Sequence, residues 1–371
     1  MGRGKRVRYY DYDWIKVIAT LGVFLYHCSM FFNPFPWHVK NNEVDTNGIL
    51  VFSLFLGVWL MPLFLGVWLM PLFFAISGIS VTYSLNNRST SNFIKERLVR
   101  LGVPLLFGMF ILSPPQVYIE RVTNYQFSGS FINFIPHYFD GLYLDIGGRG
   151  NFAFSGLHLW YLLVLLVYSI ISVPLFKTIA RRKFRKSLFV LLPFLLFLSG
   201  VIETMGIGGW DIIFYFMTFI FGYYFLSSPE FKPALVSSFK WILPIALSTS
   251  VIYIVWFMIA FPKENSIQDI IFYAVKTVNC WSWILVIFYL GNKYLTFSNN
   301  FLKYTSEASM PFYVLHQPII VAVGYFIYEL SWPIAIKAFV LITTSFILIM
   351  LLYHFVIRNV ELLRLLFGLK G

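Results

Sequence analysis

The stretch LHLWYLLVLLVYSIISVPLF (157–176) contains no Asp, Glu, Lys or Arg. A helix of about 20 apolar residues is long enough to cross the hydrocarbon core of a bilayer. The rest of the chain has the same character, because 59% of its residues are hydrophobic, only 12% are charged, and the mean hydropathy is +0.75. Soluble domains carry about 25% charged residues. The composition therefore predicts an all-α, polytopic integral membrane protein.

Similar apolar runs recur along the whole chain and predict about ten transmembrane helices. Their expected positions are 14–33, 49–85, 101–119, 157–176, 187–202, 210–227, 240–261, 267–290, 309–328 and 333–357. The connections between them are short and leave no room for a second soluble domain. We therefore expect residues 1–371 to form one membrane domain in the lipid bilayer.

The charges of the connecting segments predict the orientation independently. The chain has a net charge of +12, and its basic residues gather in short clusters such as segment 177–186. Segments of net positive and net negative charge alternate along the chain. Cytoplasmic loops carry the excess of Lys and Arg, so both termini are predicted to be cytoplasmic. This clustering is typical of loops rather than of a nucleic-acid-binding face, and we expect no nucleic-acid partner.

The second predicted span contains a direct repeat, because LFLGVWLMP occurs at 54–62 and again at 63–71. Nine helical residues advance a helix by about 13.5 Å and turn it by a net half-turn. The span is thus too long for one crossing and too short for two. We expect a kink at Pro62 or Pro71, or an extension beyond the outer surface.

The first predicted span carries two ionisable residues, Lys16 and His27, which is uncommon for a membrane helix. On an α-helix they lie within about 20° of each other and roughly 16.5 Å apart along the axis. This stripe, which includes Asp13 and Thr20, is expected to face protein or water, with Lys16 toward the cytoplasm and His27 toward the outside. Alternatively, Lys16 extends to the inner surface and His27 is a structural interior histidine.

Two further features have two interpretations each. Arg97 and Arg100, spaced i, i+3, place two guanidinium groups on one helical face, which suits a phosphate. They also suit an ordinary basic cytoplasmic loop. The longest outer connection, 120–156, is rich in Tyr, Phe, Asn and Gly. Its aromatic rings could stack on sugars or form the interfacial aromatic belt.

Several blocks resemble the acyltransferase 3 family of membrane acyltransferases. RYYDYDWIKVIATLGVFLYHCSMFF (8–32) contains the family's pattern of a basic residue, ten residues and a histidine, and FIKERLVRLGVPLLFG (93–108) resembles its Arg-x-x-Arg helix start. Four more blocks follow the family order: MPLFFAISGISVTYSL (70–85), SPPQVYIE (113–120), HLWYLLVLLVYS (158–169) and MPFYVLHQPIIV (310–321). FFNPFPWHVKN (31–41) and PPQVYIE are most similar to the branch that succinylates periplasmic glucans. The chain departs from the family in having Lys16 where Arg is commoner, and in its nine-residue repeat.

The resemblance implies an enzyme of the bacterial plasma or inner membrane that moves an acyl group, acetyl or succinyl, from cytosolic acyl-CoA to a hydroxyl of an extracytoplasmic glycan. It implies His27 as the base or the acyl acceptor. The implied donor contacts are Lys16, Arg97, Arg100 and His316, the last about ten ångströms inside the cytosolic end of its span. The implied acceptor contacts are Trp37, His38, His158 and Trp160.

The resemblance implies no permanently bound cofactor and no metal ion. The carboxylate that would orient His27 is left open among Asp140, Asp145, Glu203 and Asp211, and His137 and His354 receive no role. His316 has a structural alternative, and the acceptor contacts could instead be interfacial anchors.

Two other classes of protein compete with the enzyme. A transporter or flippase for a free or lipid-linked glycan would also use aromatic loops and buried polar residues, but it often consists of two similar halves, and we find none here. A non-catalytic sensor or scaffold would not need Lys16 and His27 on one stripe.

Overall fold

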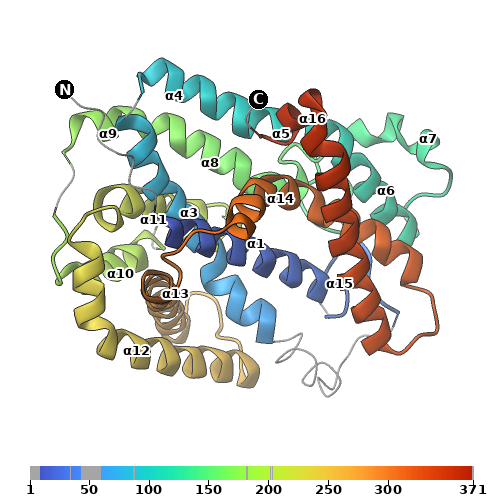
Figure 1. Ribbon diagram of the computed structural model, residues 1–371. Coiled ribbons are helices and arrows are strands. Elements are labelled where there is room, and N and C mark those ends of the chain that lie inside the picture. Colours follow the sequence, from blue (N-terminus) through green and yellow to red (C-terminus); the bar gives the residue numbers. More distant parts are fainter. Residues whose placement is uncertain are drawn as a thin grey trace. The chain divides into compact units, whose positions relative to one another are not determined.

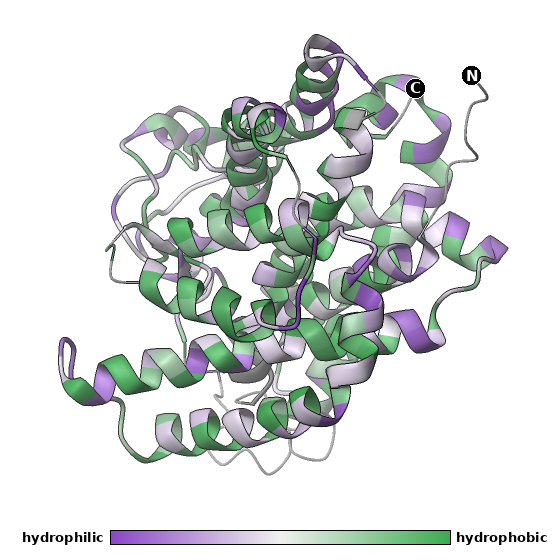
Figure 2. Cartoon of the chain, turned by 90° about the vertical axis from the view of Figure 1, so that its left-hand side faces the viewer, coloured by the Kyte–Doolittle hydropathy of each residue, from purple (hydrophilic) through white to green (hydrophobic). Residues whose placement is uncertain are grey.

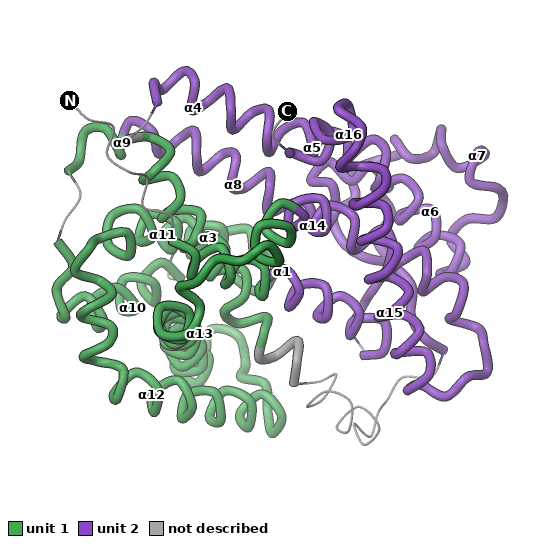
Figure 3. Tube along the Cα trace, in the orientation of Figure 1, with its two compact units in different colours: residues 1–19, 64–87, 175–307 green, residues 20–63, 88–174, 308–371 purple. Residues whose placement is uncertain are grey.

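The computed structural model describes residues 9–33, 35–42, 60–86, 88–180, 183–200, 202 and 204–369. Over these residues the chain is mostly helical (Figure 1). It also contains one short β-hairpin. The chain divides into two compact units, coloured separately in Figure 3. Unit 1 comprises residues 1–19, 64–87 and 175–307, and unit 2 comprises residues 20–63, 88–174 and 308–371.

Within the described residues, six helices are long and apolar enough to cross a bilayer: Leu65–Leu85, Thr90–Thr123, Phe231–Ile259, Ile267–Tyr294, Asn300–Ile327 and Ile334–Asn359. Shorter apolar helices cover Leu157–Ile171, Leu188–Ser199 and Ile212–Leu226. Hydrophobic residues line most of the helices, and many hydrophilic residues lie in the connections (Figure 2). The prediction of an all-α, multi-pass membrane protein is confirmed, whereas the count of ten spans and the cytoplasmic termini stay predictions.

Unit 1 contains the long helices α12 (Phe231–Ile259) and α13 (Ile267–Tyr294), which pack against each other. Ser250 joins them, because its hydroxyl accepts hydrogen bonds from Asn279 Nδ2 at 2.8 Å and from Trp283 Nε1 at 2.7 Å. The other elements wholly or mainly in unit 1 are α3 (Leu60–Asn86), α9 (Val173–Thr178), α10 (Leu188–Ser199), β1 (Gly206–Ile207), β2 (Trp210–Asp211), α11 (Ile212–Phe221) and η5 (Gly222–Leu226).

Helix α3 touches the α11–η5 helix with almost no space between the backbones. A Cβ atom on Gly78 would lie 2.0 Å from the carbonyl oxygen of Phe219, and one on Gly222 would lie 2.2 Å from that of Ala75. Small residues at a helix contact allow such close approach in membrane proteins. The pair of glycines therefore sets how closely these helices pack.

The second copy of the nine-residue repeat lies in α3, which runs from Leu60 to Asn86 and continues through Pro71. Residues 54–59 of the first copy lie outside the described residues. The expected kink or extension therefore stays a prediction.

Unit 2 contains one helical segment over Thr90–Thr123, which begins eleven residues before the predicted span 101–119. Two π-helical turns interrupt its α-helical geometry. Its parts are α4 (Thr90–Arg97), η1 (Leu98–Gly102), α5 (Val103–Phe107), η2 (Gly108–Leu112) and α6 (Ser113–Thr123). Helix α8 (Trp160–Ile171) packs beside α4 and η1 (Figure 1).

The other elements that belong to unit 2 in whole or in part are α1 (Tyr10–Met30), α7 (Phe131–Phe134), η3 (Pro136–Phe139), η4 (Leu157–Leu159), α14 (Asn300–Ile327), α15 (Ile334–Leu351), η6 (Leu352–Val356), η7 (Ile357–Asn359) and α16 (Glu361–Leu366). Helices α1 and α14 each have residues in both units. Their portions in unit 2 carry the histidines described below.

The connection 120–156 shares a small hydrophobic core with the helical residues on either side of it. Its buried members are Val117, Phe134, Tyr138, Ala153 and Leu157. The hydroxyl of Tyr138 donates to the carbonyl oxygen of Met109 at 2.7 Å, and burial raises the pKa of Tyr138 to about 12. Several aromatic rings of this connection thus pack against one another. This packing role differs from both predicted roles, sugar stacking and the interfacial belt.

Candidate active site

The candidate active site in unit 2 is centred on two histidines from α1 and α14. His27 Nδ1 and His316 Nε2 are 2.8 Å apart. His316 Nδ1 lies 2.6 Å from the carbonyl oxygen of Tyr313, and because that oxygen can only accept, Nδ1 must carry the hydrogen. In the neutral form of His316, Nε2 is then an acceptor, so His27 Nδ1 donates to it. The neutral ring of His27 therefore has its lone pair on Nε2.

Two aromatic side chains flank this pair. The ring of Trp37 stacks on His27, with the centroids 5.2 Å apart and the planes inclined by 28°. The ring of His158 lies 4.9 Å from that of His316, edge to face, and His158 Nε2 donates to the carbonyl oxygen of Val314 at 3.1 Å. Helix α14 thus positions two of the three histidines.

Two buried nitrogen atoms beside the pair have no hydrogen-bond partner among the described residues. One is Trp37 Nε1, which is a donor. The other is His158 Nδ1, which is an acceptor because the other ring nitrogen carries the hydrogen. Leaving a buried polar group unpaired costs about 1–3 kcal/mol. The site therefore offers one unpaired donor and one unpaired acceptor to a bound molecule.

A second polar group surrounds Glu120, whose side chain is 0% exposed. One carboxylate oxygen accepts from His38 Nδ1 at 2.5 Å and from the Tyr143 hydroxyl at 2.7 Å, and the other accepts from Arg121 at 3.0 Å and from the Gly147 amide at 2.8 Å. Burial and the Glu120 charge raise the pKa of Tyr143, so its hydroxyl stays a donor. The buried charge is therefore paired and fully hydrogen-bonded, as burial requires.

Two glutamines determine the proton position on His38. Gln116 Nε2 donates to the carbonyl oxygen of Leu112 at 2.8 Å, so Gln116 Oε1 is the acceptor for Gln317 Nε2 at 3.2 Å. Gln317 Nε2 therefore also faces His38 Nε2, at 3.0 Å, as a donor. Both ring nitrogens of His38 are occupied. His38 is held in place rather than available as a base, and its ring lies 5.0 Å from Trp37.

The structure brings five of the nine predicted site residues into one network in unit 2: His27, His316, His158, Trp37 and His38. The place of His316 relative to the cytosolic end of its span stays a prediction. Helix α14 begins at Asn300 rather than at residue 309, which places His316 in mid-helix beside His27. His158 and His38 also lie close to the pair, and their contact with an acceptor stays a prediction.

The basic pair has different surroundings from those expected. Arg97 ends α4 and lies 5.0 Å above the ring of Phe93, whereas Arg100 lies in the π-helical turn, 3.7 Å from Glu96. A π-helical turn changes the angular spacing that the i, i+3 prediction assumed. Arg88, which we had not considered, also pairs with Glu96. Two guanidinium groups, those of Arg88 and Arg100, thus share the Glu96 carboxylate. The role of Arg97 and Arg100 in phosphate binding stays a prediction.

The two remaining predicted residues lie in other elements. Lys16 lies in the part of α1 that belongs to unit 1, and Trp160 is the first residue of α8, two positions after His158. Helix α1 is continuous from Tyr10 to Met30, as the stripe of Lys16 and His27 requires. The roles of both residues stay predictions.

Among the described residues, none of the four carboxylates left open in the sequence forms a hydrogen bond or ion pair with His27. The partner of His27 is the imidazole of His316, and the buried carboxylate of the site is Glu120, which contacts His38. The sequence does contain a signal for Glu120. Gln116 and Glu120 are one helical turn apart in SPPQVYIE, so they share a helical face and form a polar pair on it. Of the four proposed carboxylates, Asp140 pairs with His137, and Glu203 lies outside the described residues.

In the part of the chain that the structure describes, no group of three or more His, Cys, Asp or Glu side chains is arranged to hold a metal ion.

Comparison with known proteins identifies the family of the chain. The family model described as an acyltransferase domain, that of acyltransferase 3, matches residues 9–354. The chain is 22% identical over 354 residues to glucans biosynthesis protein C of Salmonella typhi and of Salmonella typhimurium, and 21% identical over 358 residues to that of Salmonella paratyphi B. Each match covers 86% of this chain and 84% of the relative. No solved structure matches. The chain therefore belongs to the acyltransferase 3 family of membrane acyltransferases.

Proposed function

We propose that this membrane acyltransferase moves an acetyl or succinyl group from cytosolic acyl-CoA to a hydroxyl of an extracytoplasmic glucan, in the plasma membrane of a bacterium. The observation that carries the proposal is the hydrogen bond between His27 and His316, which leaves a lone pair on His27 Nε2. The names of the relatives support a glucan as the acceptor.

In the proposed reaction His27 acts as the general base. Its Nε2 takes the proton of the acceptor hydroxyl while the hydroxyl oxygen attacks the thioester carbonyl. The C–S bond then breaks, and the proton on His27 passes to the leaving sulfur, which gives free CoA and the O-acylated glucan. Alternatively, His27 Nε2 attacks the thioester carbonyl, the C–S bond breaks, and CoA leaves as the thiolate. The acyl group then passes from Nε2 to the hydroxyl oxygen, and the hydroxyl proton goes to the CoA thiolate.

His316 has a positioning role in this proposal. By accepting from His27 Nδ1, it holds the tautomer in which Nε2 is basic, and it stabilises the ring when that ring becomes positively charged. The carboxylate of a Ser-His-Asp triad does the same for its histidine.

The unpaired nitrogens supply two further roles. Trp37 Nε1 is available to donate to the oxygen that becomes negative when the thioester carbonyl is attacked. His158 Nδ1 is available to accept from the acceptor hydroxyl or a neighbouring one. On the donor side, Lys16, Arg97 and Arg100 are proposed to contact the phosphates of CoA.

The test is acyl transfer by the purified full-length protein in lipid nanodiscs. Acetyl-CoA and succinyl-CoA would each be supplied with a periplasmic glucan, and free CoA would be measured together with the mass of the glucan. We expect CoA release that depends on the glucan, with a glucan mass gain of one acetyl or one succinyl group. A protein that binds the glucan but leaves its mass unchanged with both donors would contradict the proposal.

A further inference from the structure

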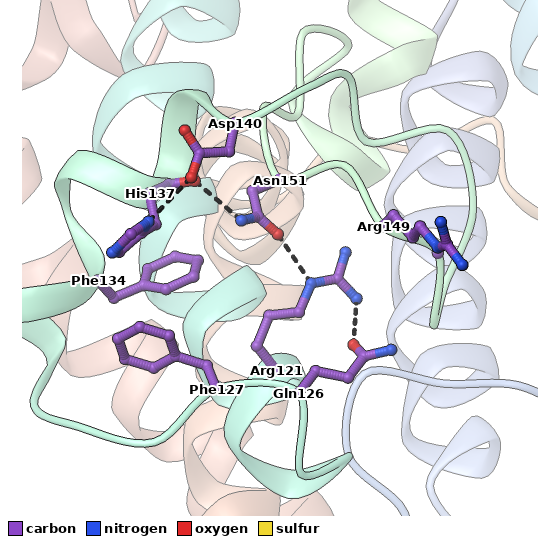
Figure 4. Close-up of a pocket in the computed structure, with 9 residues that line it drawn as sticks. Arg121, Gln126, Phe127, Phe134, His137, Asp140, Arg149 and Asn151 are labelled. Atoms are coloured by element: carbon purple, nitrogen blue, oxygen red, sulfur yellow. Dashed lines mark hydrogen bonds and ion pairs between the residues drawn. The ribbon is translucent and has the colours of Figure 1, made fainter.

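A pocket of about 290 Å³ lies in segment 121–151 of unit 2 (Figure 4). None of its lining residues belongs to the histidine network, although Arg121 also donates to Glu120. We call it the loop pocket, and its lining residues are Arg121, Gln126, Phe127, Phe134, His137, Asp140, Gly148, Arg149 and Asn151. Its volume is at the lower end of the range of small-molecule sites, about 300–1,000 Å³.

One wall of the loop pocket is held rigidly by hydrogen bonds. Arg121 donates to Asn151 Oδ1 at 2.8 Å, and Asn151 Nδ2 donates to the carbonyl oxygen of His137 at 2.8 Å (Figure 4). Arg121 also donates to Gln126 Oε1 at 2.7 Å. Arg121 and Asn151 are buried. A ligand would therefore find the wall already formed, which reduces the entropy cost of binding.

The rest of the lining combines aromatic rings with exposed polar groups. The rings of Phe127 and Phe134 are 5.2 Å apart, and that of His137 is 5.8 Å from Phe127. His137 Nδ1 lies 2.9 Å from Asp140 Oδ2, and their side chains are 56% and 64% exposed. Arg149 is exposed and makes no hydrogen bond or ion pair with the described residues. Apolar surface beside planar polar groups suits a molecule with one apolar face and a polar edge.

The charges of the loop pocket favour a neutral ligand. The guanidinium of Arg121 is paired with Glu120 at 3.0 Å, so it adds little positive charge. One cation, Arg149, and one carboxylate, Asp140, then remain. A phosphate would meet the Asp140 carboxylate, which repels it. A sugar ring has apolar C–H faces and an edge of hydroxyl groups, and needs no net charge.

We propose that the loop pocket binds a neutral sugar unit of the acceptor glycan, with the ring against Phe127 and its hydroxyl groups bonded to His137, Asp140 and Arg149. The identification of the sugar as part of the acceptor rests on the function proposed above. The loop pocket would then hold the acceptor, while the histidine network carries out the transfer.

The test compares binding of glucose tetrasaccharides of defined linkage by the wild-type protein and by a variant with Asp140→Ala and Arg149→Ala. Saturation-transfer NMR on full-length protein in nanodiscs would give the affinity. We expect the double variant to bind at least about tenfold more weakly, because two or more hydrogen bonds to the sugar are lost. Leu144→Ala, in the same segment but outside the pocket and 82% exposed, is the matched control and should bind normally.

Three outcomes would overturn the proposal: wild-type affinity in the double variant, displacement of the sugar by inorganic phosphate, or no binding of any tetrasaccharide to the wild type. Kinetic measurements distinguish failure of the loop pocket proposal from failure of the proposed acyl transfer. If the wild type transfers acyl groups and the double variant has an unchanged KM for the glucan, the loop pocket proposal fails alone. If the wild type binds sugar here but transfers no acyl group, the proposed function fails together with the identification of the sugar as an acceptor, whereas sugar binding by the loop pocket stands.

Discussion

His316 Nε2 accepts a hydrogen bond of 2.8 Å from His27 Nδ1, and the carbonyl oxygen of Tyr313 determines that proton arrangement. A second imidazole therefore occupies the place that a carboxylate has in a Ser-His-Asp triad. A neutral partner avoids burying a second charge directly beside His27, where an ion would be costly. In the reaction proposed above, that cost would arise only when His27 gains a proton, and His316 would then face the charge with its lone pair.

The first prediction concerns His316. His316→Leu should lower kcat by about 100-fold or more, since the tautomer and orientation of His27 are no longer held, and removal of the corresponding contact in a serine protease costs about 10⁴-fold. The KM for acyl-CoA should change little. His316→Gln should recover part of the rate, because the Gln carbonyl oxygen can still accept from His27 Nδ1. Equal losses in both variants, or a raised donor KM in His316→Leu, would instead indicate that His316 contacts the donor.

The second prediction concerns donor binding. The double variant with Arg97→Ala and Arg100→Ala should raise the apparent donor constant at least about tenfold, since charged hydrogen bonds contribute about 1.5–3 kcal/mol each. Of the two single variants, Arg100→Ala should weaken donor binding less than Arg97→Ala. Arg100 lies 3.7 Å from Glu96, so its positive charge is partly compensated. Lys95→Ala, an exposed basic residue of the same helix, is the control. Isothermal titration with a non-hydrolysable acyl-CoA analogue measures the effect, and unchanged affinity would make the pair ordinary loop charges.

The third prediction concerns orientation. The two native cysteines, Cys28 and Cys280, are buried, so an introduced thiol should dominate labelling by a membrane-impermeant maleimide. Leu144→Cys, in the connection predicted to be outside, should react in intact spheroplasts. Lys186→Cys, in the basic segment predicted to be cytoplasmic, should react only after permeabilisation. The reverse pattern would overturn the orientation inferred from charge.

The fourth prediction concerns the glycine contact between α3 and η5. Gly222→Val should lower the melting temperature or prevent accumulation, because its Cβ would lie 2.2 Å from the backbone oxygen of Ala75, which cannot move like a side chain. Overpacking of this kind costs about 1–3 kcal/mol or more. Gly206→Ala is the matched control, since nothing lies within 4 Å of its added Cβ. The melting temperatures are measured by fluorescence-detected size exclusion. Equal values for Gly222→Val and the wild type would show that the helices are not in close contact at Gly222.

The helical class of the fold was predictable because the length and hydrophobicity of an apolar run depend only on neighbouring residues in the sequence. The starts of the helices were less predictable. Helix α12 begins at Phe231 rather than at 240, since a helix continues into residues too polar for the bilayer interior. The π-helical turns η1 and η2 were not predictable, because they produce no distinct hydropathy pattern.

The site was only partly predictable, for a different reason. His27 and His316 were both candidates, but their contact joins residues 289 positions apart, and spacing along one helix carries no information on such contacts. The hydrogen bonds that join Gln116, Gln317 and His38 were not predicted. Glutamine occurs in many structural settings, so its presence in a sequence predicts no role. Glu120 was overlooked because the end of its helix was placed at residue 119, which left Glu120 in a loop.

The last prediction concerns His27 itself. His27→Gln should lower acyl transfer by about 10²–10⁴-fold, the usual contribution of a general base. Gln keeps a hydrogen-bonding side chain of similar reach but cannot take a proton at neutral pH. Donor affinity and expression should stay near wild type, since the residues proposed to hold the CoA phosphates are elsewhere in the chain. The measurement is the rate of glucan-dependent CoA release with saturating donor and acceptor, in protein matched for melting temperature.

Trp37→Phe separates the base from the surrounding packing. It keeps an aromatic ring against His27 but removes the unpaired indole N–H, so it should lower kcat without changing the pH dependence of the rate. His27→Gln should remove that dependence together with most of the rate, because the group that accepts the proton is gone. A Gln variant with more than about a tenth of wild-type turnover would defeat the general-base role. Failure of both variants to accumulate in the membrane would mean instead that the stacked pair of His27 and Trp37 supports the fold.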